Sequence, residues 1–146
     1  MAFAKVSKGL SKVGALIGGH PFVLEVANTP ETLQKGLMGR SSLEPNAGML
    51  FQFFDAPQFR YFWMKGCLIP LDILFVNDRR IVHIEHLAQP CLPEVSRLNA
   101  CPVITTRHTV DTVIEIAGGR ARKIGLQSGD VLQWLAPSGQ LPSSSR

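Results

Sequence analysis

Short apolar segments separated by turn-forming residues recur along most of the chain. Segments of this length, punctuated by Gly, Pro, Asn and Asp, are typical of β-strands in an all-β sandwich or barrel. Two of them flank Asn77 and Asp78, which indicates a β-hairpin there. The pattern therefore predicts a mainly β fold, as a single compact β-sandwich or barrel-like domain. The expected strands cover residues 22–26, 48–54, 60–64, 71–76, 80–87, 112–117 and 130–135.

Two short helices are expected to interrupt this β pattern. Thr29 can cap a helix N-terminus, Pro30 suits the first helical position, and Glu31 places an acid in the first turn. We therefore expect one short N-terminal α-helix to begin here and to end near Gly39, which can adopt a left-handed cap. Residues 119–125 indicate one further helical turn near the C-terminus.

The two ends of the chain differ from this middle part. Residues 1–20 form a basic leader in which apolar residues recur every three or four positions, as in an amphipathic helix: Phe3, Val6, Leu10, Val13 and Ile17. The leader lacks the continuous apolar run of a secretory signal, so we expect it to be flexible. A degenerate export signal and contact with a membrane surface are the alternatives. The β domain then covers residues 21–136, and residues 137–146 form a disordered tail rich in Ser and Pro.

Length and charge exclude several classes of protein. A chain of 146 residues is expected to form one domain with a core of its own. The net charge is +4, but from residue 25 onward twelve basic residues face eleven acidic ones, so we expect no nucleic-acid-binding face. The apolar segments are too short to span a bilayer, which predicts a soluble domain without a transmembrane segment. Localisation stays open, with the cytoplasm slightly favoured over export.

The cysteines leave two interpretations of the long connection at residues 88–106. This segment contains three prolines and two of the three cysteines, Cys91 and Cys101. They could form a disulfide in an oxidising compartment. Alternatively, both could be buried thiols that pack as small apolar groups, like Cys67. A loop of this length is usually functional or clamped.

Seven short motifs follow one another in the order of a known family. Together they resemble the bacterial and archaeal domain of unknown function 192 family, over about residues 22–135. The resemblance implies a compact, mainly β domain, often found behind a signal peptide, with no established biochemical role. One motif departs from the family, because Gly66 and Cys67 stand where Asn-Thr usually follows. The motifs are E-V-A-x-T (25–29), G-L-M-x-R (36–40), G-M-L-F (48–51), F-W-M-K (62–65), P-L-D-I-L-F (70–75), I-E-I-A-G (114–118) and G-D (129–130).

Three carboxylates on expected strands are candidates for chemistry. Glu25, Asp72 and Glu115 each share a strand face with apolar neighbours, because alternate residues of a strand point the same way. A buried carboxylate needs a partner, so structural ion pairs are one interpretation. The other is a hydrolase or lyase that uses one of the three as general acid or base. The cations expected to contact them are Arg40, Lys65 and Arg107.

The leading hypothesis is a binding site for a small ligand, for which an anion is one option, or for a protein partner. Cations, an aromatic ring and a flexible thioether occur within the motifs and would suit such a site. Core packing and a purely structural interaction module are the alternatives. Whether the protein is an enzyme stays open, and no cofactor or oligomeric state is predicted. The proposed ligand-binding residues are Arg40, Met49, Trp63, Lys65 and Asp72.

A metal site at His83, Glu85 and His86 is not favoured. H-x-E followed by Pro90 and Cys91 is similar to a zinc deaminase signature, but that signature requires P-C-x-x-C, which is absent. His83 and Glu85 share a strand face, so a weak site completed by a loop cysteine remains an alternative to an exposed edge strand. We therefore predict no metal.

Overall fold

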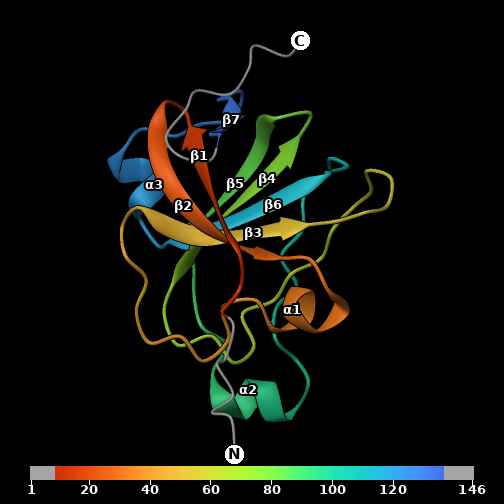
Figure 1. The fold of residues 1–146 in the computed structure, drawn as a ribbon. Helices are drawn as coiled ribbons and strands as arrows, with labels where there is room; N and C mark the ends of the chain where they lie inside the picture. Colours follow the sequence, from red (N-terminus) through yellow and green to blue (C-terminus); the bar gives the residue numbers. More distant parts are fainter. Residues whose placement is uncertain (1–8, 137–146) are drawn as a thin grey trace, which may run out of the picture.

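The computed structural model describes residues 9–136, which form one curled β-sheet with three short helices (Figure 1). The seven strands follow the order β5-β4-β6-β3-β2-β1-β7 across the sheet. Within the described residues, no helix has the length and apolar character needed to cross a membrane. The strands are β1 (Lys12–Ile17), β2 (His20–Ala27), β3 (Ala47–Gln52), β4 (Leu71–Asn77), β5 (Arg80–Ala88), β6 (Thr112–Ala117) and β7 (Leu132–Trp134). The helices are α1 (Pro30–Lys35), α2 (Pro93–Arg97) and α3 (Arg120–Lys123).

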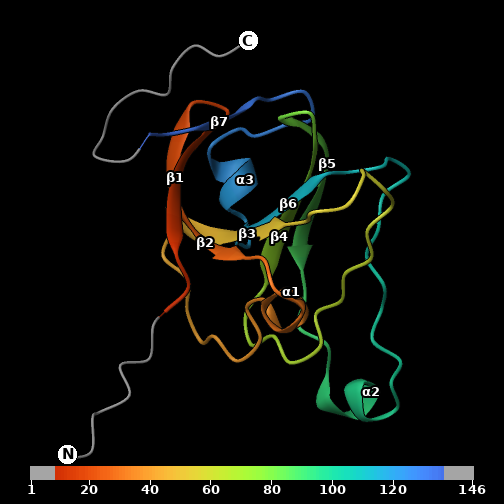
Figure 2. The same ribbon diagram turned by 45° about the vertical axis from the view of Figure 1, so that its right-hand side comes forward.

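The sheet curls into a half-barrel whose two edge strands meet at one end (Figure 2). All neighbouring strands are antiparallel except β2 and β3. Arg80 of β5 bridges Val131, and the Ile81 N–H donates to the Asp130 carbonyl at 2.9 Å. The fold is therefore mainly β, as expected. Of the two expected forms it is the barrel-like one, because one sheet curls on itself and no second sheet packs against it in residues 9–136.

Each face of the sheet carries its own part of the core. The inner face, inside the curl, packs against α3 and includes Leu24, Leu50 and Ile114. The outer face packs under α1 and the long loops, and includes Phe51 and Phe75. Alternate residues of β3, β4 and β6 go to opposite faces, which explains why these strands are apolar along their length.

Local sequence signals account for α1 and for the β4–β5 turn. The Thr29 side chain accepts a hydrogen bond from the Thr32 N–H at 3.1 Å, and Pro30 is the first helical residue. At the turn, Asp78 and Arg79 both have positive φ angles, of 50° and 61°. Such a pair of left-handed residues matches the twist of a tight hairpin even without glycine.

Three elements differ from the sequence-based expectation. Residues 12–20 were expected in a flexible leader, but 12–17 form β1, which pairs with β2 and β7. Pairing on both sides buries the alternate residues Ala15 and Ile17. The segment therefore follows the two-residue period of a strand and not the three- or four-residue spacing of a helix. Residues 60–64 do not form a strand, although Phe62 exchanges hydrogen bonds with Ile104. The 88–106 connection contains an unexpected helix, α2. The rest of the leader, residues 1–8, and the tail, residues 137–146, lie outside the described residues.

Asp72 holds three chain segments together on the inner face. Its side chain is fully buried and accepts hydrogen bonds from the backbone N–H groups of Leu87 (2.8 Å), Gly119 (3.0 Å) and Ala121 (2.8 Å). The last residues of β5 and the start of α3 are thereby tied to β4. A carboxylate with three donors is stable in the core because its lost hydration is replaced.

The substitution Asp72→Asn is expected to destabilise the fold strongly. An amide has only one acceptor oxygen, so at least one of the three N–H groups loses its partner. We expect the free energy of unfolding to fall by about 2–4 kcal/mol in urea titrations. The matched control is Asp111→Asn, where one N–H, of Asp78, is bound at 2.9 Å near the surface. A loss at Asp72 no greater than at Asp111 would contradict the anchoring role.

Candidate functional site

A cavity of about 450 Å³ lies on the outer face of the sheet. It is enclosed by the C-terminal end of α1, by strands β3 and β6, and by the loop at residues 58–67. Most of its lining is apolar or aromatic, as in sites for small organic molecules. The apolar lining includes Leu33, Leu37, Met38, Phe51, Phe53, Phe59, Phe62 and Trp63.

Glu115 is the buried acid of this cavity. Only 4% of the residue is exposed, and its register neighbours on β3 and β4 are the apolar residues Met49 and Ile73. Within residues 9–136 its carboxyl group accepts no hydrogen bond. Burial raises the pKa of Glu115 from 4.5 to about 8. At neutral pH the group therefore keeps its proton and can donate a hydrogen bond into the cavity.

Cys67 is a second buried group of the lining. The residue is 8% exposed, and burial raises the pKa of its thiol to about 11, with a further contribution from the charge of Glu115. A thiol with this pKa is protonated at neutral pH, so it is not a nucleophilic thiolate. The preceding Gly66 has a φ of 72°, and a Cβ there would lie 2.6 Å from Cε of Met38. A side chain at position 66 would therefore require Met38 to move, and the positive φ also favours glycine.

Three cations line the cavity, and they differ in their partners. Arg60 pairs with Asp55 and lies 3.8 Å above the Phe53 ring. Lys65 Nζ lies 5.1 Å from the centre of the Trp63 ring and donates to the Asn99 side-chain oxygen at 3.4 Å. Lys35 is in the last turn of α1. The cavity is therefore rimmed by positive charge around an apolar interior.

The structure does not bring the proposed ligand-binding residues together. Trp63 and Lys65 line the cavity, but Asp72 lies on the other face of the sheet, where it binds α3. Met49 is fully buried in the core. Arg40 is not in the lining and forms a bidentate ion pair with Glu25, at 2.8 and 2.9 Å.

Each of the three candidate carboxylates has a different environment. Hydrogen bonding to Arg40 holds the pKa of Glu25 below its ordinary value, as expected for a structural ion pair. Asp72 is saturated by backbone donors. Glu115 alone lines the cavity. The expected cation partner is therefore found for Glu25, which pairs with Arg40. Backbone N–H groups take the place of a cation at Asp72, and Glu115 has neither kind of partner within the described residues.

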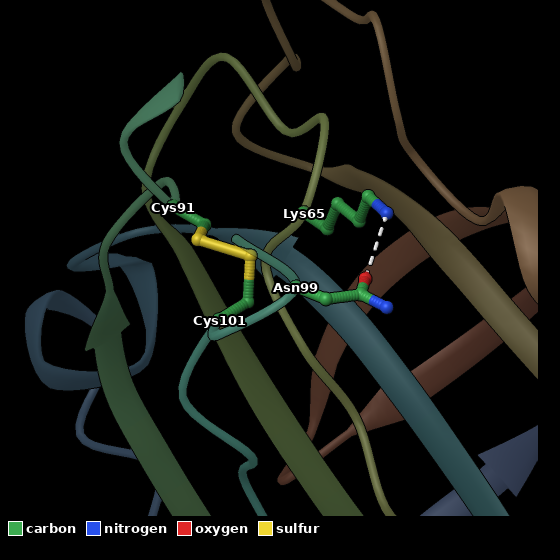
Figure 3. The surroundings of a disulfide bond; sticks show 4 residues. All are labelled: Lys65, Cys91, Asn99 and Cys101. Atoms are coloured by element: carbon green, nitrogen blue, oxygen red, sulfur yellow. Dashed lines mark hydrogen bonds between the residues drawn. A yellow bond between two sulfur atoms is a disulfide. The ribbon is translucent and has the colours of Figure 1, made fainter. Parts of the chain in front are cut away.

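A disulfide joins Cys91 to Cys101 and closes the loop that carries α2 (Figure 3). Of the two interpretations of the long connection, the structure therefore shows the bridge, and Cys67 is the free thiol. The Met64 carbonyl accepts hydrogen bonds from the N–H groups of both Cys67 and Cys91, each at 3.2 Å. The disulfide loop is thus attached to the turn that carries Lys65 and Cys67.

Sequence and structure comparisons place this domain in a family. The model of the family DUF192, described as "Uncharacterized ACR", matches residues 13–134. The chain belongs to the DUF192 family. The match begins within β1, so the family's domain includes the strand that was expected to be a leader.

Two solved structures resemble this DUF192 domain. A protein of unknown function from Novosphingobium aromaticivorans is 34% identical with a TM-score of 0.74, and the alignment covers 91% of each chain. A "putative transcription regulator" from Sinorhizobium meliloti is 29% identical with a TM-score of 0.77, over 88% of this chain and 97% of that one. A search of curated proteins finds no match.

Sequence patterns indicate Trp63 as a wall of the DUF192 cavity, but not Phe53, Phe59 and Tyr61, because a strand is expected at residues 60–64. A signal was present, since seven of the eleven aromatic residues lie between positions 51 and 63. Six of these seven residues follow β3, in the loop that lines the cavity or its surroundings. On β5, His83 and Glu85 contact each other at 3.4 Å, and residues 9–136 contain no cluster of three or more metal-ligating side chains.

The buried Glu115 predicts a specific pH dependence of stability. Between pH 4.5 and about 8 the folded protein keeps this proton while the unfolded chain releases it. The stabilising contribution of protonated Glu115 to the free energy of unfolding is therefore complete below pH 4.5, and it is lost as the pH rises toward 8. Relative to Glu115→Gln, which cannot ionise, the wild type should lose stability over this range, by about 5 kcal/mol at most. Urea titrations at pH 5, 7 and 8.5 measure the difference, and parallel curves would contradict the buried, unpaired carboxyl.

Proposed function

We propose that this domain binds a small, mainly apolar or aromatic molecule in the outer-face cavity. A carbonyl or hydroxyl oxygen of that molecule would accept a hydrogen bond from protonated Glu115. The observation that carries this proposal is the buried carboxyl group, which lines an aromatic cavity and has no partner among the described residues. Cavities of this kind typically combine apolar walls with a few polar groups that orient the ligand.

The energetics favour a ligand with an acceptor at this position. A hydrogen bond from protonated Glu115 to a ligand oxygen would contribute about 0.5–1.5 kcal/mol net. A ligand without an acceptor would leave the group unpaired, so Glu115 would act as a specificity group. Trp63, which is 38% exposed, would cover the ligand from the loop side.

The proposed site replaces the earlier grouping around Arg40 and Asp72. Those two residues have structural partners, Glu25 and the backbone of α3, whereas Trp63 and Lys65 remain in the site. A polar group inside an apolar cavity supports a ligand more than a purely structural interaction module. The description of the Sinorhizobium meliloti protein does not change this proposal, because the near balance of charges after residue 24 offers no broad basic face for DNA.

The neutral naphthalene ketone Prodan is a suitable probe, because its emission reports both an apolar site and a hydrogen bond to its carbonyl. We expect binding to wild type, and binding about fivefold or more weaker to Glu115→Met, which lacks a donor. Glu115→Gln should retain binding, since its amide can donate. Trp134→Phe leaves Trp63 as the sole tryptophan, so quenching of its fluorescence reports probe binding, and the Glu115 variants assign that binding to the cavity.

Arg40→Ala is the matched control for this experiment. It removes a cation that lies outside the lining, and Prodan affinity should not change. Equal affinity of wild type and Glu115→Met, or a bound probe that leaves Trp63 fluorescence unchanged, would contradict the proposed site.

A second candidate function is general acid catalysis by Glu115 in a hydrolase or lyase. The raised pKa favours it, because a carboxyl group that is protonated near neutral pH can donate a proton to a leaving group. In that case water would attack the ester carbonyl while Glu115 protonates the departing alkoxide, so turnover of an alkyl ester such as ethyl benzoate should fall as the pH rises through about 8. Glu115→Gln should lower it at least a hundredfold, while still binding Prodan. Turnover unaffected by Glu115→Gln would exclude this function for the ester.

A further inference from the structure

The mouth of the cavity carries more positive than negative charge. Besides Glu115, the lining contains three charged residues, and all three are cations: Lys35, Arg60 and Lys65. A neighbouring hollow of about 370 Å³ shares Lys35, Lys65 and Trp63 with the cavity and adds Glu31. The two hollows therefore meet at the lysines, on the side of α1 and Trp63.

Neither Lys65 nor Lys35 forms an ion pair among residues 9–136, and Lys65 is the one of the two with recorded neutral partners. Arg60 is neutralised by Asp55, and Glu31 stands one helical turn before Lys35 on α1. By contrast, Lys65 contacts only neutral groups, the Trp63 ring and the Asn99 side-chain oxygen. A half-buried ammonium group with neutral partners can gain a charged hydrogen bond from an incoming anion.

The disulfide loop determines where Asn99 lies (Figure 3). Asn99 stands two residues before Cys101 and has a φ of 58°, a conformation that asparagine tolerates better than most residues. Its N–H donates to the Ser96 carbonyl at 2.9 Å, which fixes its backbone against α2. Its side-chain oxygen then reaches Lys65, 34 positions earlier in the chain.

We infer that the ligand of this cavity carries an acidic group, a carboxylate or sulfonate, which Lys65 binds at the mouth while Asn99 positions Lys65. This inference rests on the proposed function and adds the charge of the ligand to it. The ligand class is then an amphipathic organic acid. Its apolar body would lie between the aromatic side chains, with the acidic group at Lys65 and a neutral oxygen near Glu115.

Two naphthalene probes that differ by one sulfonate group test this inference. They are the anionic 8-anilinonaphthalene-1-sulfonate and the neutral N-phenyl-1-naphthylamine, both of which fluoresce in apolar sites. Their dissociation constants are measured on the full chain carrying Trp134→Phe by quenching of Trp63, and the Lys65 variant below assigns the anionic probe to the cavity mouth. We expect the anionic probe to bind about fivefold more tightly, as for one charged contact near a surface.

Three single-residue variants show which side chains cause the tighter binding of the anionic probe. Lys65→Met keeps the approximate length of the side chain. It should bring the ratio of the two dissociation constants, neutral probe over anionic probe, to about one. Asn99→Gly suits the positive φ and removes the side-chain oxygen, so the ratio should fall partway while the neutral probe binds unchanged. Lys123→Met removes an exposed cation of α3, which lies outside the cavity, and should leave the ratio as in wild type.

The outcomes separate this inference from the proposed function. Equal binding of both probes at Trp63 would overturn the acidic-ligand inference and leave the cavity function intact. A preference for the anion that survives Lys65→Met would overturn it as well, because another group would then hold the sulfonate. If none of the probes, Prodan included, quenches Trp63, the proposed function itself is wrong. Loss of the preference in Lys65→Met, but not in Lys123→Met, supports the inference.

Discussion

A carboxylate removed from water must either accept hydrogen bonds or keep its proton, and this sheet buries one on each face. Asp72, on the inner face, is stabilised because three backbone N–H groups of β5 and α3 donate hydrogen bonds to it. Glu115, on the outer face, lies between Met49 and Ile73 and has no such donors among the described residues. One acid thus ties β4 to β5 and α3, while the other lines the outer-face cavity without a hydrogen-bond partner among residues 9–136.

The outer-face cavity depends on segments that the sheet alone does not position. Helix α1 ends at Gly36, whose backbone comes so close to β3 that a Cβ would lie 3.1 Å from the Phe51 ring. The aromatic-rich loop at residues 58–67 is held by two backbone hydrogen bonds between Phe62 and Ile104. The disulfide loop is attached through the Met64 carbonyl and reaches Lys65 through Asn99. Helix α1 and the loop at residues 58–67 therefore line the candidate site, the disulfide loop contacts it through Asn99, and the sheet supplies Glu115.

Part of the candidate site, Trp63, Lys65 and Glu115, could be named from the sequence, but the site could not be assembled from it. Alternation along each strand correctly put Asp72 with Leu74 and Glu115 with Val113 on shared faces. It could not show that these faces are opposite ones, because that depends on which strands pair and in which register. Arg40 likewise lies in a motif with candidate site residues, but in the structure it forms an ion pair with Glu25.

The sequence by itself determined the family, the mainly β class, most strands, and the start of α1 at Thr29 and Pro30. These features depend on local periodicity, capping and turn chemistry, which act between residues a few positions apart. Tertiary structure decided that residues 12–17 form a strand, that one sheet curls on itself, and that Cys91 bridges Cys101. It also decided which of three similar carboxylates keeps its proton. The reason is physical: burial and pairing are properties of the neighbours that folding supplies, and those neighbours lie far away along the chain.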